Sequence, residues 1–198
     1  WSEAVFGGGG PGEASPRRRY FPEFQKAVMD TTVRRALVLM GPRRVGKTVM
    51  VYQSVRTLLD AGVQGERILY LSLETPVFTG LPLEKLLNYF REIHGHSRTT
   101  PLYLYFDEIQ YLRDWEVHLK SLVDSYPDCR FIATGSAAAA LRIKSNESGA
   151  GRFSDFILPP LTFAEYLSFI GREEELIAPS SSRDEHGGKT YASRDIAE

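Results

Sequence analysis

Short apolar runs alternate with helix-like segments along most of the chain. The run from Ala36 to Met40 is apolar throughout and ends at Gly41, which is typical of a buried parallel strand. Similar runs predict further strands over residues 67–73, 101–106, 130–134 and 153–158. Between them, apolar residues fall on one helical face and predict helices over residues 47–61, 82–93 and 161–170, with another that Asp114 can cap.

This alternation predicts an α/β fold with a doubly wound, mostly parallel five-stranded sheet and helices on both faces. Ligands in such sheets bind at the carboxyl ends of the strands. The turn at Gly41, the pair Asp107-Glu108 and the turn over residues 134–136 all follow strands directly. We therefore expect these three segments to meet at one edge of the sheet.

The turn after the first strand has a complete phosphate-binding sequence. Residues 41–48 read Gly-Pro-Arg-Arg-Val-Gly-Lys-Thr, which matches the P-loop pattern G-x-x-x-x-G-K-[ST] between a strand and a helix. Backbone amides can face an anion there, Lys47 can reach the β- and γ-phosphates, and the Thr48 hydroxyl can bind Mg²⁺. This context disfavours an ordinary glycine turn. The predicted ATP-binding residues are Gly41, Pro42, Arg43, Arg44, Val45, Gly46, Lys47 and Thr48.

An acidic pair follows the strand predicted over residues 101–106. Asp107 can hold the water shell of Mg²⁺ together with Thr48, and Glu108 can act as the general base that polarises the attacking water. Two solvated acids in a turn are the alternative. A full strand–helix unit separates this pair from the P-loop. This spacing suggests a P-loop NTPase of the additional-strand class and favours ATP hydrolysis over phosphoryl transfer to a small molecule.

Two further positions are candidates for contact with phosphate. Thr134 or Ser136 could touch the γ-phosphate or the attacking water, although Ser136 could instead cap a helix. Arg152 could reach a phosphate in the same or a neighbouring subunit as an arginine finger, or it could be a surface arginine. We therefore include Ser136 among the predicted cofactor-binding residues, and Arg152 joins Glu108 and Lys47 as predicted catalytic residues.

In chain order, these motifs resemble those of a group of bacterial and archaeal AAA+-type ATPases. The resemblance rests on residues 41–48, Phe106-Asp107-Glu108-Ile109-Gln110 with Asp114-Trp115, Ala133-Thr134-Gly135-Ser136, Gly151-Arg152, and residues 158–167. It spans about residues 35–167, and its Asp-Glu-Ile-Gln and Pro-Leu-Thr-Phe-x-Glu-Tyr blocks are more specific than the P-loop. Departures are Val49, where the family often has Thr, and residues 137–140, where it often has a Ser-rich turn.

The resemblance implies an AAA+-like ATP-binding core with Mg²⁺, in which Lys47, Thr48, Asp107 and Glu108 have the family's roles. Members usually continue into a winged-helix region and a domain related to restriction endonucleases, and this chain ends before either could fit. We expect a flexible lead-in over residues 1–22, the ATPase core over 23–171, and a polar linker or tail over 172–198. The chain starts with Trp1 rather than Met, so we expect a fragment or a processed product.

Composition narrows the classes of partner. The chain has 198 residues and a formal net charge of −1, so no overall basic excess favours nucleic acid. Residues 17–19 are all arginine and form either a solvated charge run or a nucleic-acid or phosphate contact. The single cysteine, Cys129, excludes an internal disulfide, and no apolar run approaches the length of a membrane span. We therefore expect a cytoplasmic protein without membrane contact. The histidines lack ligand spacing, so no metal site beyond Mg²⁺ is predicted.

These observations predict an enzyme that binds and hydrolyses ATP with Mg²⁺. The alternative is a nucleotide-gated switch or binding module that hydrolyses ATP slowly while it holds a partner. A small-molecule kinase is disfavoured because the sequence has no arginine-rich lid. A homo-oligomer and a DNA or protein partner are compatible with either reading.

Overall fold

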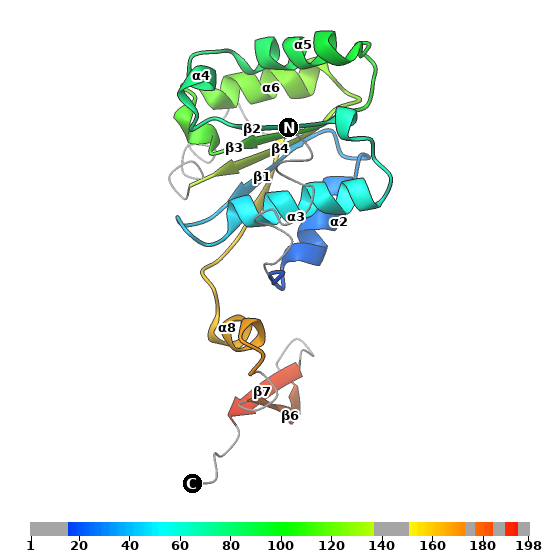
Figure 1. Ribbon diagram of the computed structural model, residues 1–198. Helices are drawn as coiled ribbons and strands as arrows, with labels where there is room; N and C mark the ends of the chain where they lie inside the picture. Colours follow the sequence, from blue (N-terminus) through cyan, green and yellow to red (C-terminus); the bar gives the residue numbers. More distant parts are fainter. Residues whose placement is uncertain (1–15, 137–150, 173–176, 184–188, 194–198) are drawn as a thin grey trace. The chain divides into compact units, whose positions relative to one another are not determined.

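The computed structural model describes residues 16–136, 151–172, 177–183 and 189–193. The chain forms two compact units that divide after Pro159. The first unit contains a five-stranded sheet with the strand order β2-β3-β4-β1-β5 (Figure 1). Residues 1–15 of the lead-in predicted over residues 1–22, and the Ser-poor turn at 137–140, lie outside the described residues.

All four strand pairings in this sheet are parallel. β1 (Ala36–Met40) pairs with β4 (Arg130–Gly135) on one side and with β5 (Phe153–Ile157) on the other. β3 (Tyr103–Asp107) lies between β4 and β2 (Ile68–Ser72). β4 therefore separates the strand that precedes the P-loop from the strand that ends in Asp107, and the predicted α/β fold with an additional strand is confirmed.

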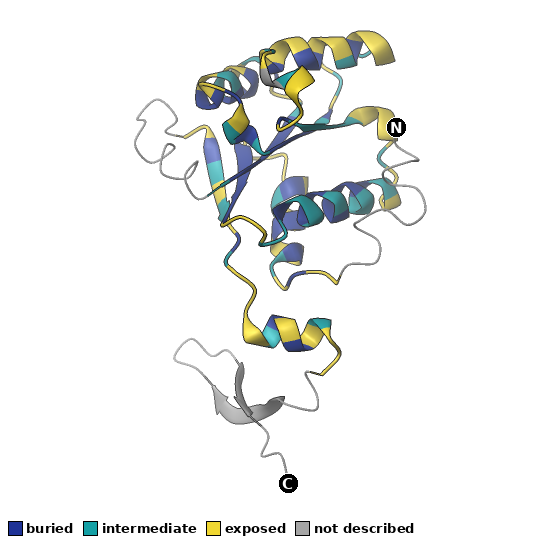
Figure 2. Ribbon diagram, turned by 60° about the vertical axis from the view of Figure 1, so that its left-hand side comes forward, coloured by how far each residue is buried: buried dark blue, intermediate teal, exposed yellow. Residues whose placement is uncertain are grey.

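Helices cover both faces of the sheet (Figure 1). α2 (Phe21–Met29) and α3 (Lys47–Asp60) lie on one face, and α5 (Leu83–His94) and α6 (Trp115–Ser125) lie on the other. Successive residues of β1 point to opposite faces, so Val38 packs in the cluster with α5 and α6, whereas Leu37 packs in the cluster with α2 and α3. β1, β3 and β4 are mostly dark in Figure 2 because both of their faces are covered.

A buried arginine ties α2 to the amino end of the sheet. The guanidinium of Arg130, at the start of β4, donates to four backbone carbonyls, those of Ala27, Val28, Val33 and Arg35. Burial lowers the pKa of Arg130 from its usual value. The hydrogen bonds satisfy the buried cation and fix the segment between α2 and β1.

Several local features differ from the sequence predictions. The short helices α4 (Pro76–Thr79), η1 (Gly65–Arg67) and η2 (Ile109–Tyr111) were not predicted, nor was α2. Asp114 precedes α6, but its side chain makes no capping hydrogen bond. Its backbone is left-handed, with φ of 52°, whereas a capping residue usually has an extended backbone, so the predicted cap is wrong.

The described residues of the second unit form one helix and a two-stranded hairpin. α8 (Phe163–Phe169) begins with a capping box, in which the Thr162 side chain and the Glu165 side chain bond each other's backbone N–H. β6 (Ile177–Arg183) and β7 (Lys189–Ser193) pair antiparallel. The sequence analysis assigned this polar stretch to a linker or tail and did not predict the hairpin. The domain limits at residues 22 and 171 remain predictions.

No helix among the described residues has both the length and the apolar character needed to cross a bilayer.

Candidate nucleotide-binding site

The carboxyl ends of β1 and β3 bring the P-loop and the acidic pair together. Thr48 ends the P-loop and is the second residue of α3. Its hydroxyl donates to Asp107 Oδ2 over 2.9 Å, although the two residues are 59 positions apart. Asp107 is the last residue of β3 and is only 3% exposed. The hydroxyl and the carboxylate that were predicted to share Mg²⁺ are therefore direct neighbours.

The P-loop follows a tight path that depends on its glycines. Gly46 has φ of 94°, a left-handed conformation that favours glycine. Gly41 lies so close to the chain after β5 that a Cβ there would be 2.3 Å from the carbonyl oxygen of Leu158. Lys47 is 4% exposed, and its Nζ donates to the carbonyls of Gly41 and Pro42 over 3.1 and 2.9 Å. The ammonium group is thus held inside the curve of the loop.

Arg18 supports the P-loop from outside. Its Nη1 donates to the Val45 carbonyl over 2.7 Å, and its Nη2 donates to the Pro159 carbonyl over 3.0 Å. With only 6% of its surface exposed, Arg18 is not part of a solvated charge run, so that reading is wrong for this residue. This role could not be predicted, because a short arginine run has no pattern that distinguishes one buried member.

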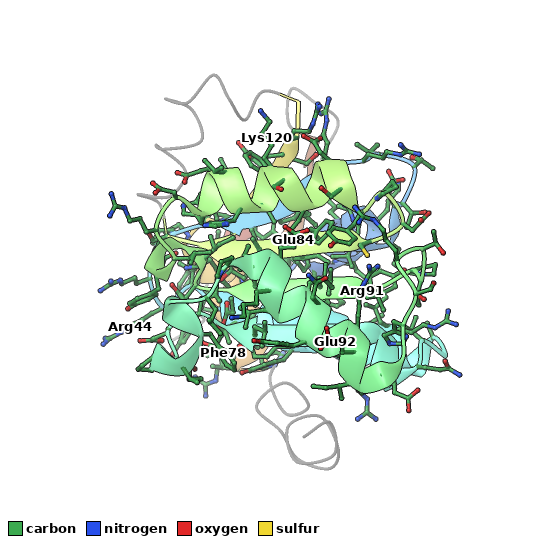
Figure 3. All side chains as sticks on the ribbon, turned by 90° about the horizontal axis from the view of Figure 1, so that it is seen from above. Arg44, Phe78, Glu84, Arg91, Glu92 and Lys120 are labelled. Atoms are coloured by element: carbon green, nitrogen blue, oxygen red, sulfur yellow. The ribbon has the colours of Figure 1, made fainter. Side chains whose placement is uncertain are left out.

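The two arginines inside the P-loop sequence are exposed. Arg43 and Arg44 both face solvent, and Figure 3 shows the Arg44 side chain extending outward from the fold. Arg44 also has a left-handed backbone, with φ of 65°. Both guanidinium groups are therefore accessible beside the loop.

Three hydroxyl groups surround the Asp107 carboxylate. Besides Thr48, Tyr70 on β2 donates to Oδ2 over 3.0 Å, and Thr134 on β4 donates to Oδ1. Burial and the nearby Asp107 carboxylate raise the pKa of the Tyr70 hydroxyl well above its usual value, so this hydroxyl keeps its proton. The sequence analysis missed Tyr70. Its strand was predicted, but the pairing of β2 with β3 could not be read from the sequence.

Glu108 stands at a sharp turn after β3. Its backbone is left-handed, with φ of 55°, and its N–H donates to the Thr134 hydroxyl over 2.9 Å. Its carboxylate accepts a hydrogen bond from the Gln110 side-chain amide. Gln110 in turn accepts from the Ser136 N–H over 3.2 Å. Of the two sensor candidates, Thr134 contacts the acidic pair with its side chain, whereas Ser136 is connected to it through its backbone.

Arg152 lies at the amino ends of the strands, opposite the carboxyl ends that carry the P-loop. Its carbonyl accepts from the N–H of Ala36 at the beginning of β1, whereas the P-loop follows the end of β1. At about 3.3 Å per residue, the five residues of β1 separate the two by roughly 16 Å. The Arg152 guanidinium instead pairs with Asp124 at 2.5 Å. The structure therefore does not bring Arg152 to the P-loop of its own chain, which corrects that part of the prediction.

The donor set fits the predicted ligands. Mg²⁺ prefers oxygen ligands and usually combines one or two protein oxygens with phosphates and water. The Thr48 hydroxyl and the Asp107 carboxylate provide such oxygens beside a loop of backbone amides. Among the described residues, no group of three or more His, Cys, Asp or Glu side chains gathers to form another metal site.

The fold and this site define an AAA+ P-loop ATPase at the level of the family. Residues 33–167 match a family model described as AAA domain, and the chain belongs to this family. An uncharacterized protein of Methanocaldococcus jannaschii is 33% identical over 132 residues, which cover 66% of this chain and 27% of that protein. An uncharacterized protein of Haemophilus influenzae is 28% identical over 130 residues, covering 66% of this chain and 32% of its own length. The chain thus matches only about a third or less of these relatives.

A solved structure supports the fold assignment. The ORC1 protein of Aeropyrum pernix, determined in complex with DNA, superposes with a TM-score of 0.56 at 14% sequence identity. The superposition covers 83% of this chain and 50% of the ORC1 chain. At this identity the likeness concerns the fold alone.

Proposed function

We propose that this chain binds ATP with Mg²⁺ at the P-loop and hydrolyses it, with Glu108 as the general base. The observation that carries the proposal is the hydrogen bond between Thr48 and Asp107, because it joins the two predicted Mg²⁺ positions at the mouth of the P-loop. If the loop were an ordinary glycine turn and the acids were merely solvated, no such contact between them would be expected. Membership of the AAA domain family supports the same conclusion.

The residues of the chain divide the work as follows. The amides of residues 41–48 hold the phosphates at the positive end of α3. When ATP binds, Lys47 gives up its hydrogen bonds to the Gly41 and Pro42 carbonyls and donates to the β- and γ-phosphates instead. Thr48 and, through its water shell, Asp107 would hold Mg²⁺, which would neutralise charge on the phosphates. Glu108 accepts the proton of the attacking water, and Thr134 fixes the backbone of Glu108.

The first experiment measures phosphate release from Mg-ATP at a series of protein concentrations for the parent chain and for Glu108→Gln. We expect the variant to bind ATP with unchanged affinity and to lose at least about 100-fold in turnover, the usual contribution of a general base. Lys47→Ala should weaken binding or abolish turnover. If Glu108→Gln hydrolyses ATP at the parental rate, the base assignment is wrong.

A matched control separates the role of Glu108 from a general effect of charge. Glu92 is exposed on α5, well outside the site, and is labelled in Figure 3. Glu92→Gln makes the same chemical change and should leave turnover at the parental level. A comparable loss in Glu92→Gln would show that the effect of Glu108→Gln does not report on the site.

A nucleotide-gated switch is the second candidate, and the position of Arg152 favours it. The ion pair with Asp124 holds this arginine at the opposite edge of the sheet, so it does not complete the site of its own chain. Turnover per chain that rises with protein concentration would support completion of the site by a neighbouring copy, and Arg152→Ala should then remove the rise. Negligible turnover at all concentrations with intact ATP binding would favour the switch.

DNA is one partner that a switch of this fold could hold, since the ORC1 protein of similar fold was solved with DNA. Arg43 and Arg44 present exposed charge beside the nucleotide site. Binding of a fluorescent duplex, measured by anisotropy with and without ATP, tests this idea. Affinity that is equally weak in both states would exclude nucleotide-gated DNA binding.

A further inference from the structure

Gln110 belongs to the Asp-Glu-Ile-Gln block, but the proposed function uses only the two acids of this block. Gln110 is the second residue of η2, which follows Glu108 directly. Ile109, between Glu108 and Gln110, is fully buried. Ile109 therefore anchors the turn in the core, while the side chains of Glu108 and Gln110 are both half-buried and in contact with each other.

The hydrogen bonds of Gln110 fix the orientation of its amide. Its Oε1 accepts from the backbone N–H of Ser136 over 3.2 Å, and a backbone N–H can only donate. Its Nε2 donates to Oε2 of Glu108. A flipped amide would place two donors against each other at Ser136 and two acceptors against each other at Glu108. The end of β4 thus sets which group of Gln110 faces the carboxylate.

We propose that Gln110 is a positioning residue for Glu108, and this inference rests on the proposed role of Glu108 as the base. The amide nitrogen holds one carboxylate oxygen, Oε2, and leaves the other, Oε1, to accept a proton from water. A half-buried carboxylate on a short turn would otherwise be free to rotate about its side-chain bonds. Gln110 therefore connects the base to the end of β4 without touching the substrate.

The decisive variant is Gln110→Glu, which keeps the shape of the side chain but removes the donor. One carboxylate oxygen can still accept from the Ser136 N–H, while the other now faces Glu108. We expect turnover to fall on the order of 10-fold, within the range that a misplaced catalytic group costs, with the Kd for Mg-ATP unchanged. Gln110→Leu, which removes both hydrogen bonds, should show the same separation between turnover and binding.

A double-mutant comparison distinguishes positioning from a general structural effect. Single-turnover hydrolysis with excess protein is measured for Gln110→Glu in the parental chain and in the Glu108→Gln background. We expect the added loss to disappear in the second background, because the group that Gln110 positions is gone. An equal loss in both backgrounds would overturn the proposal. Parental or higher turnover of both Gln110→Glu and Gln110→Leu would overturn it as well.

Two controls complete the test. Gln64→Glu makes the same change at an exposed position and should leave turnover unchanged. In the ligand-free protein, the side-chain amide NMR signals of Gln110 should shift on Glu108→Gln, and unchanged signals would overturn the contact whatever the kinetics show. If Glu108→Gln alone retains parental turnover, the proposed function fails first. If Glu108→Gln is inactive but Gln110→Glu and Gln110→Leu both keep parental turnover, only the inference about Gln110 fails.

Discussion

At the scale of single residues, the site consists of a few polar contacts between elements that the fold brings together. Asp107 accepts from the hydroxyls of Thr48, Tyr70 and Thr134, which come from three different elements. A buried carboxylate in such surroundings is both fixed in orientation and satisfied by hydrogen bonds. Substitutions that change one contact at a time should therefore have separable effects on folding and on ligand binding.

The closest backbone approach in the site predicts a stability effect. Gly41→Ala would place a Cβ 2.3 Å from the Leu158 carbonyl oxygen, and this backbone atom cannot rotate away. We expect the free energy of unfolding to fall by about 1–3 kcal/mol, the usual cost of overpacking. Urea denaturation measures the change. Gly80→Ala, where a Cβ would meet open space, is the control and should lower the free energy of unfolding by far less.

Removal of the Tyr70 hydroxyl should weaken the binding of Mg²⁺ rather than the binding of the nucleotide. Its donor bond to Asp107 Oδ2 orients the carboxylate beside Thr48. Tyr70→Phe should raise the Mg²⁺ concentration needed for half-maximal hydrolysis roughly 10-fold, as losses of outer-shell partners do. ATP binding without Mg²⁺ should stay unchanged. Tyr103→Phe, at a half-buried position on β3, is the matched control. Equal Mg²⁺ requirements for Tyr70→Phe and the parent would show that Tyr70 does not orient Asp107.

At the scale of elements, apolar patterning predicted all five strands of the main sheet and the longer helices α3, α5 and α6 between them. β1 and the strand of Asp107 were clear because buried parallel strands are continuously apolar. The meeting of the P-loop with the acidic pair followed from the direction of parallel strands. Patterning failed where long-range pairing decides the contacts, as for Tyr70 and Arg18, and for the β6–β7 hairpin, whose residues are too polar to show strand periodicity.

Arg18 links the segment before α2 to two other elements, the P-loop and the end of β5. Arg18→Leu would leave the Val45 and Pro159 carbonyls without this donor. We expect the free energy of unfolding to fall by about 1.5–3 kcal/mol, the usual contribution of hydrogen bonds made by a charged group. The Kd for ATP should rise as well, because the loop loses its support.

Arg34, whose side chain is exposed, provides the control for this prediction. Arg34→Leu should change stability by no more than about 0.5 kcal/mol, as surface substitutions do. Thermal melting and fluorescence titration with an ATP analogue measure both quantities. An Arg18→Leu chain that binds ATP with parental affinity would show that Arg18 supports the fold but not the nucleotide site.

At the scale of the whole molecule, the division after Pro159 separates the site from the rest of the chain. Every described residue to which a role in ATP binding or hydrolysis is assigned, from Arg18 to Arg152, belongs to the first unit. The strands and helices that position these residues belong to it as well. The second unit, with α8 and the hairpin, has its own capping box and its own strand pairing.

A chain truncated after Pro160 should therefore fold and bind Mg-ATP. Its Kd should lie within about twofold of that of the full chain, the difference expected when independent parts are changed. Isothermal titration of both chains measures this, and thermal melting shows whether the shorter chain is folded. Parental stability with binding at least tenfold weaker would mean that the second unit contributes contacts to the nucleotide. That result would contradict the assignment of the whole nucleotide site to the first unit.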